Sequence, residues 1–249
     1  MYIQNGNYKY IPYHSLFTKT EEIDILDEGV FEAYANRDSL SYREIYNLPN
    51  IPSMLRGTLR KKGFCRAWNI FVQLGITDDS FQIVNSGEMT WKSFLNSFLD
   101  DDKNKTVKQK LTDQLSISQE DLNKLEWLGI FEDENIELNI GTPAQFLQLL
   151  LESKLNLESG DKDMIVMQHL LEYSIDGQKK NLKSSLVLKG VDDLNTAMSM
   201  TVGLPVAIAS ELLLNDKISL KGVVIPIHKE IYNPVLEKLE EFGIKFIEE

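Results

Sequence analysis

The chain reads Tyr-Ala-Asn-Arg-Asp-Ser at residues 34–39 and Met-Leu-Arg-Gly-Thr-Leu-Arg at residues 54–60. These two segments bring Arg37, Arg56 and Arg60 close together in a chain whose 38 acidic residues outnumber its 26 basic residues. An arginine side chain presents a planar fork of N–H donors that matches the two oxygens of a carboxylate. Several such forks are typical of a site for a small ligand with more than one negative charge. The alternative that stays open is that these arginines pair with some of the surface acids.

Composition limits the class of protein. The chain has 249 residues, of which 43% are hydrophobic, so it is long enough for one large or two modest cores. Its net charge of −12 argues against a nucleic-acid-binding surface. Cys65 is the only cysteine, so an intrachain disulfide is excluded. No run of about 18 apolar residues is evident and the first residues lack a secretion signal, so we expect no membrane span and a cytoplasmic enzyme or enzyme fragment.

Turn and helix signals organise the chain. Asn5-Gly6 and Asp176-Gly177 each lie between strand-favouring residues and predict two β-hairpins. Apolar spacing predicts a helix from Phe64 to Leu74, whose first amides we expect to add positive potential beside the second arginine segment. Further strands are predicted at residues 29–34, 222–225 and 244–247. Further helices are predicted at residues 42–48, through most of 90–154, from Asp193 or Asn195 to Leu214 with a break at 203–205, and at 231–242, with Val235, Leu236, Leu239 and Phe242 facing inward.

This order of strands, helices and strands predicts an α+β fold with a mixed β-sheet, flanking helices and a mostly helical inserted lobe. The sheet part is expected to comprise residues 1–40 and 160–249. Residues 41–159 are expected to form the helical insertion. Ligand groups commonly lie at strand ends and in loops, which is where the first arginine segment falls.

Both arginine segments, together with Gly-Phe-Cys-Arg-Ala-Trp at 63–68, resemble the substrate domain of the saccharopine dehydrogenase family (saccharopine reductase, NADP-dependent, L-glutamate-forming). Residues 196–205 and 224–232 resemble the same family. The resemblance runs from about residue 29 to the C-terminus, with a weakly matching middle. Ala35 departs from the family's usual proline, which loosens the backbone there and removes no chemical group.

The resemblance implies an oxidoreductase of lysine metabolism that interconverts saccharopine with 2-aminoadipate 6-semialdehyde and L-glutamate by hydride transfer. It implies that Arg37 and Arg60 each hold a substrate carboxylate. Thr58 and Leu59 are expected to complete that contact through backbone amides and the Thr58 hydroxyl. The supporting residues, which orient the loop or pair with the arginines, are Arg56, Asn36, Asp38 and Ser39. Gly57, between Arg56 and Thr58, is expected to let the backbone approach a ligand closely; the alternative is an ordinary turn glycine.

The cofactor is not expected on this chain. In the family, NADP binds mainly to a Rossmann domain that precedes the matched region, and no Gly-x-Gly-x-x-Gly follows a strand here. We therefore expect a substrate-binding C-terminal domain without its Rossmann domain, which alone neither turns over nor binds NADP tightly. No catalytic acid or base is assigned, and no metal motif is present.

Two other functions stay open. The chain could be a stand-alone, non-catalytic module that binds an amino-acid-derived anion. It could instead belong to a carboxynorspermidine-type reductase, although an amine-rich substrate favours acids where this chain has arginines. The expected partners are saccharopine or a glutamate-like molecule, the Rossmann domain of the parent enzyme, and a second copy of the chain in a homodimer, with no nucleic acid and no membrane.

Overall fold

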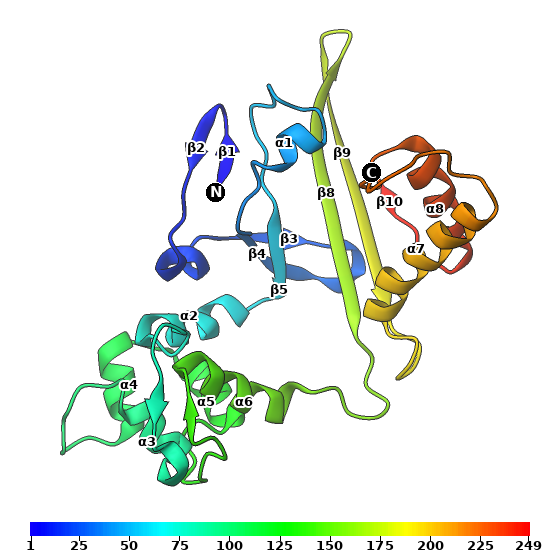
Figure 1. The fold of residues 1–249 in the computed structure, drawn as a ribbon. Coiled ribbons are helices and arrows are strands. Elements are labelled where there is room, and N and C mark those ends of the chain that lie inside the picture. The colour runs from blue at the N-terminus through cyan, green and yellow to red at the C-terminus, as the bar shows by residue number, and fades with distance from the viewer. The chain divides into compact units, whose positions relative to one another are not determined.

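The computed structural model describes residues 1–249 and divides them into two compact units, which we describe separately. Figure 1 shows strands and helices in the mixture expected for an α+β fold, and that prediction is confirmed. The strands form four small sheets of two or three strands, and every pair is antiparallel, so the single mixed sheet is not observed. The first unit comprises Met1–Asp24, Val30–Arg43 and Leu48–Asn156; the second comprises Ile25–Gly29, Glu44–Asn47 and Leu157–Glu249.

The first unit opens with the predicted hairpin. Strands β1 (Tyr2–Gln4) and β2 (Asn7–Lys9) pair antiparallel around Asn5 and Gly6. Both turn residues have positive φ, 49° and 76°, as a type I′ turn requires. The 3-10 helix η1 (Tyr13–Thr18) follows and buries Phe17.

A three-stranded sheet carries both arginine segments. Its order is β3 (Thr20–Asp24), β4 (Val30–Ala35) and β5 (Gly57–Lys61), with η2 (Leu26–Glu28) between the first two strands. The short helix α1 (Tyr42–Ile45) lies in the connection from β4 to β5. Side chains alternate between the faces of a sheet, so the register of β4 and β5 decides which predicted site residues share a face.

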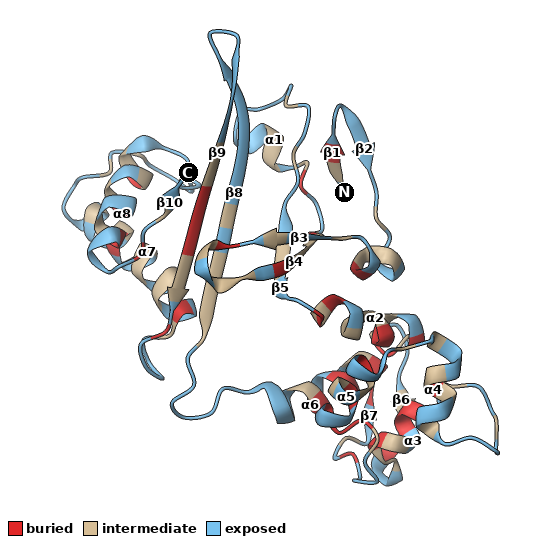
Figure 2. Cartoon of the chain, turned by 180° about the vertical axis from the view of Figure 1, so that it is seen from behind, coloured by how far each residue is buried: buried red, intermediate tan, exposed pale blue.

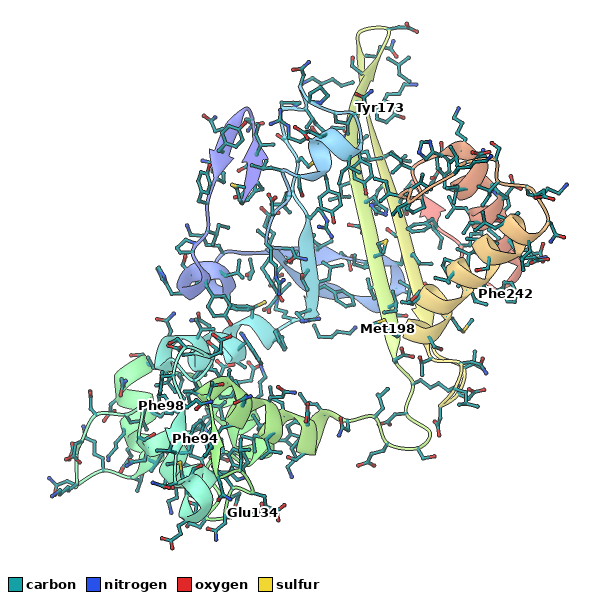
Figure 3. The ribbon with its side chains drawn as sticks, viewed as in Figure 1. Phe94, Phe98, Glu134, Tyr173, Met198 and Phe242 are labelled. Atoms are coloured by element: carbon teal, nitrogen blue, oxygen red, sulfur yellow. The ribbon has the colours of Figure 1, made fainter.

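The helical lobe has the most completely buried core of the molecule, visible as the red segments of Figure 2. Phe94 is fully buried, and its ring lies 5.2 Å from Phe98 and 5.3 Å from Phe146, centroid to centroid (Figure 3). Thr142 caps its helix with a reciprocal Gln145 contact, and Pro143 is the first helical residue. The elements are α2 (Phe64–Leu74), β6 (Ile83–Val84), η3 (Ser86–Glu88), α3 (Trp91–Asn96), α4 (Val107–Leu115), α5 (Gln119–Leu128), β7 (Ile140–Gly141) and α6 (Pro143–Leu155).

The second unit is built on a long hairpin. Strands β8 (Met164–Ile175) and β9 (Gln178–Lys189) pair along their whole length around Asp176 and Gly177, which confirms the second hairpin prediction. Strand β10 (Ile247–Glu248) adds to β9. Helices α7 (Ala197–Leu214) and α8 (Lys229–Glu241) supply the buried Ile208, Ile231, Val235 and Leu239 that pack with Leu186 of β9.

Three predictions for this unit were wrong in detail. Thr196, not Asp193 or Asn195, caps α7 by accepting a hydrogen bond from the Ser199 amide. The helix continues through residues 203–205 with Pro205 inside it, so the predicted break is absent. Residues 222–225 form no strand, because no neighbouring strand pairs with them and Val223 is fully exposed.

The inward face of α8 was also predicted only in part. Val235 and Leu239 are buried, whereas Leu236 and Phe242 are 48% and 45% exposed. The closing strand spans only Ile247–Glu248 instead of residues 244–247, and Ile244 packs into the core. The predicted division into a sheet part and a helical insertion stays a prediction.

Helix α7 has an apolar face that this chain leaves uncovered. Met198, Val202, Val206 and Leu213 follow helical spacing along it and are each more than half exposed. By length and composition α7 is a candidate membrane span, so the expectation that no segment reaches that threshold was wrong. Core helices of globular proteins can have the same length and composition, so α7 alone does not establish a membrane span.

Candidate functional site

The antiparallel ladder of β4 and β5 places the predicted site residues on defined faces. Tyr34 pairs with Thr58, and Glu32 pairs with Arg60, so these four side chains belong to one face. Leu59, which pairs with Ala33, belongs to the opposite face, so only its backbone remains available beside Thr58 and Arg60. Because β5 is the outer strand, some of its backbone amides point away from β4 and stay available to a ligand.

The antiparallel pairing of β4 and β5 continues by one residue pair, Asn36 and Arg56, beyond the ends of the two strands. The Asn36 amide donates to the Arg56 carbonyl at 2.7 Å, which places Arg56 beside Asn36 and next to Arg37. Gly57 lies between Arg56 and Thr58, and a Cβ there would come within 3.1 Å of the Tyr34 carbonyl oxygen. The glycine therefore allows β5 to approach β4 closely at the site.

Three polar residues shape the loop that carries Arg37. The Asn36 side chain accepts a hydrogen bond from the Arg37 amide at 2.7 Å, and Asp38 accepts one from the Leu40 amide at 2.9 Å. Ser39 is fully buried, and its hydroxyl accepts from the Arg56 amide at 2.9 Å. These contacts agree with a loop-orienting role, but Asp38 forms no ion pair with an arginine, so that part of the expectation was wrong.

The three site arginines have no acidic partner. None of the ion pairs in the chain includes Arg37, Arg56 or Arg60, and all three are exposed. Arg66 behaves differently, since its guanidinium donates to Asp121 at 2.6 Å and to Glu120 at 2.7 Å. The alternative in which the site arginines pair with surface acids is therefore not observed.

Glu32 occupies the start of helix α2. Its two carboxylate oxygens accept hydrogen bonds from the Gly63 and Cys65 amides, each at 2.9 Å. Burial raises the pKa of this carboxyl, but the two amide hydrogen bonds outweigh it and leave the pKa below its ordinary value. The positive end of α2 is thus neutralised by Glu32, so the added potential expected beside Arg60 is largely cancelled.

Cys65 is not an activated thiol. It is 2% exposed, and burial, followed by its contact with the Glu32 carboxylate, raises its pKa to about 12. A nucleophilic cysteine needs a lowered pKa and access to solvent. Cys65 therefore serves packing.

The arginines are spread along the ladder. Arg56 and Arg60 are four residues apart in extended chain, which corresponds to about 13 Å between their Cα atoms. Arg37 lies at the Arg56 end. This spacing fits a ligand with anionic groups at both ends better than a single carboxylate.

Two hollows of the molecular surface are lined by residues other than the arginines. One, of about 490 Å³, is lined by residues that include Ser159, Asp192 and Asp193 of the second unit. The other, of about 240 Å³, is lined by residues that include Glu137 and Glu152 of the helical lobe. Their aspartates and glutamates would repel a carboxylate, so we place the candidate site at the arginines and not in either hollow.

Residues 1–244 match the family model described as "Saccharopine dehydrogenase C-terminal domain". The chain belongs to this family. The resemblance drawn from the arginine segments is thereby confirmed. What each of the predicted residues binds stays a prediction.

The curated relatives in the saccharopine dehydrogenase group are longer than this chain. Alpha-aminoadipic semialdehyde synthase of Bos taurus is 37% identical over 224 residues, which cover 86% of this chain and 24% of that protein. Saccharopine dehydrogenase [NADP(+), L-glutamate-forming] of Pyricularia oryzae is 32% identical over 227 residues, which cover 86% of this chain and 50% of that protein. The chain therefore spans half or less of the length of these two relatives.

A solved structure supports the fold over the whole chain. Apo saccharopine dehydrogenase (L-Glu forming) from Saccharomyces cerevisiae superposes with a TM-score of 0.88 at 28% identity. The match covers 100% of this chain and 57% of that one. The chain thus has the architecture of the corresponding part of a saccharopine dehydrogenase.

Three residues at the site were missed from the sequence. Glu32, Tyr42 and Phe64 each contact an arginine segment or the helix that follows it. The alternation of Glu32 with Tyr34 could have placed Glu32 on the site face. Tyr42 could not be identified, because its contact with Arg56 depends on how the chain returns from α1 to β5. Phe64 is only four residues from Arg60, and this short separation was a signal that the sequence offered.

Proposed function

We propose that this chain is the substrate-holding part of a saccharopine dehydrogenase of the L-glutamate-forming type. The observation that carries the proposal is the set of three exposed arginines, Arg37, Arg56 and Arg60, that lack acidic partners in a chain of net charge −12. A cation that stays unpaired among so many acids is available to an anionic ligand. Membership of the saccharopine dehydrogenase C-terminal domain family supports the same substrate class.

The number and spacing of the arginines suit saccharopine. This molecule joins the lysine and glutamate skeletons through a secondary amine and carries three carboxylates, at least one at each end. Arg60 would hold a carboxylate at one end of the ladder, and Arg37 with Arg56 would hold those at the other. The Thr58 hydroxyl and the outward amides of β5 would add hydrogen bonds between them.

The chain's own residues bind and orient; we derive no step of hydride transfer from them. NADP, when bound, supplies the hydride acceptor or donor for the carbon next to the secondary amine. No segment of this chain has a glycine-rich phosphate loop that would fit the dinucleotide. We therefore infer that NADP binds mainly to a Rossmann domain in the part of the relatives that this chain does not cover.

The uncovered face of α7 supports a partner domain. Val202 and Val206 are 59% and 64% exposed, and Met198 near the start of the helix is 56% exposed (Figure 3). Contiguous exposed apolar side chains of this kind mark interaction surfaces. We infer that this face packs against the part of the enzyme that holds the cofactor. A homodimer is a separate arrangement, for which the free edge of β8 is the candidate surface.

The two alternative functions stand differently against the arginines. A non-catalytic anion-binding module would use the same arginines, and it differs only in giving no turnover when the cofactor-binding part is supplied. A carboxynorspermidine-type reductase binds an amine-rich substrate, for which three unpaired arginines are the wrong charge.

Calorimetric titration of the chain with saccharopine, L-glutamate and carboxynorspermidine tests the proposal. We expect saccharopine to bind most tightly, glutamate more weakly because it engages fewer arginines, and carboxynorspermidine least. Equal or tighter binding of carboxynorspermidine would contradict the proposal. Turnover upon adding a separately produced cofactor-binding domain of a relative, with NADP, would distinguish the enzyme from the binding module.

A further inference from the structure

Two of the site arginines stand over aromatic rings. The Cζ atom of Arg56 lies 4.0 Å from the centroid of the Tyr42 ring, and that of Arg60 lies 5.2 Å from the centroid of the Phe64 ring. Both distances are within the range of a cation–π interaction. An aromatic ring attracts a guanidinium and limits its motion without neutralising its charge.

The acid that could have paired with Arg60 is engaged elsewhere. Glu32 stands directly opposite Arg60 in the ladder, where opposite charges normally pair. Both of its oxygens instead accept backbone amides at the start of α2. The N–H donors of Arg60 are therefore left for a ligand, while its face rests on Phe64.

Phe64 is itself held in place by a series of rings. It stacks on Trp68 with an interplanar angle of 11° and a centroid distance of 5.6 Å. Trp68 contacts Phe17 at 6.3 Å, and Phe17 contacts Tyr34 at 4.9 Å. These contacts join α2, η1 and β4, so the orientation of the Phe64 ring is determined by three elements of the first unit.

We propose that Phe64 is a positioning residue that fixes the Arg60 guanidinium in the orientation in which it donates hydrogen bonds to a substrate carboxylate. This inference rests on the proposed function. Phe64 does not touch the substrate in this scheme; it acts through Arg60. Pre-orienting a flexible arginine reduces the entropy lost when the ligand binds.

The test compares Phe64→Leu with Phe64→Tyr in saccharopine titrations of the 249-residue chain. Leucine keeps an apolar side chain but removes the ring, and we expect binding to weaken by about two- to fivefold, as the loss of an exposed cation–π contact predicts. Tyrosine keeps the ring and should restore the affinity. In an Arg60→Ala background, Phe64→Leu should have no further effect on binding.

The chain offers a matched control on the opposite face of the ladder. The Lys61 ammonium lies 4.3 Å from the centroid of the Phe31 ring, so Phe31→Leu removes another cation–π pair beside the site strand. We expect this variant to lose stability, since Phe31 is buried, while a folded sample keeps wild-type affinity. Equal losses of affinity in the two leucine variants would overturn the positioning role.

A second measurement needs no ligand. The ¹⁵N relaxation of the Arg60 Nε–Hε group should report restricted motion in wild-type and Phe64→Tyr protein and faster motion in Phe64→Leu. Unchanged relaxation in Phe64→Leu would overturn the inference even if saccharopine binds. Failure of the wild-type chain to bind saccharopine, with the relaxation difference present, would instead overturn the proposed function alone.

Discussion

Glu32 and Arg60 face each other across neighbouring antiparallel strands and yet form no ion pair. The carboxylate of Glu32 is bound by the amides that begin helix α2, and the guanidinium of Arg60 lies over Phe64. One residue thus stabilises the junction between the sheet and the helical lobe, and the other stays available to an anion. The strand pair thus anchors the start of α2 through Glu32 and leaves the Arg60 guanidinium without an acidic partner.

Glu32→Gln should destabilise the fold without abolishing it. Glutamine keeps one acceptor oxygen but loses one of the two charge-assisted hydrogen bonds, which costs about 1–2 kcal/mol. The pKa of Glu32 is lower in the folded chain than its ordinary value of 4.5, so its stabilisation is present above that pH and lost as the pH falls through the folded-state pKa. Urea unfolding between pH 7 and pH 3 should show a weaker acid dependence in the variant; an identical dependence would argue against this role.

Arg37→Ala and Arg60→Ala should each weaken saccharopine binding at least about tenfold, because each removes a carboxylate contact that is hard to replace. Lys62→Ala is the matched control, since Lys62 lies two residues from Arg60 and is engaged by Glu22 at 2.7 Å on the surface. That variant removes the same charge and should change the affinity less than about twofold. Titration calorimetry at two salt concentrations checks the comparison; equal effects of all three substitutions would point to a general electrostatic attraction.

Cys65 should not react with iodoacetamide in the folded chain at pH 8. Its thiol is 2% exposed and its pKa is raised to about 12, so almost no thiolate is present at that pH. Labelling should appear only as denaturant unfolds the first unit, with a midpoint that follows the loss of helix signal. Rapid labelling of native protein, measured by mass spectrometry, would contradict the packing role.

Val206→Glu should reduce the exposed apolar surface of α7 while leaving the fold intact, because the side chain already faces outward. We expect less binding of the dye ANS and loss of association with the cofactor-binding part of a relative, measured by sedimentation. Glu211→Lys is the control, because it changes the charge at an exposed polar position about 140° around the same helix from Val206. Normal association of the Val206 variant would exclude this face as the docking surface, and association with lipid vesicles instead would favour a membrane contact.

The turns and helix caps of this fold could be predicted from the sequence, because they depend on residues that are adjacent in the chain. Asn5-Gly6 and Asp176-Gly177 require positive φ values that few other residues tolerate, and Thr142-Pro143 supplies a helix cap within four residues. The two arginine segments were likewise recognisable because their residues are close in the chain. Signals of this kind need no knowledge of distant contacts.

Only the tertiary structure decided strand pairing, side-chain burial and charge pairing, because each of these depends on which other segment lies alongside. Residues 222–225 have the composition of a strand but lack a neighbour to complete their hydrogen bonds, and Leu236 and Phe242 are apolar but face outward. The register of β4 and β5 placed Arg60 opposite Glu32, and the start of α2 placed the Gly63 and Cys65 amides on the Glu32 carboxylate. The sequence determined which residues carry the charge and where the chain turns; whether a charge is paired or free was decided by contacts between segments that are distant in the chain, because pairing depends on distance in space.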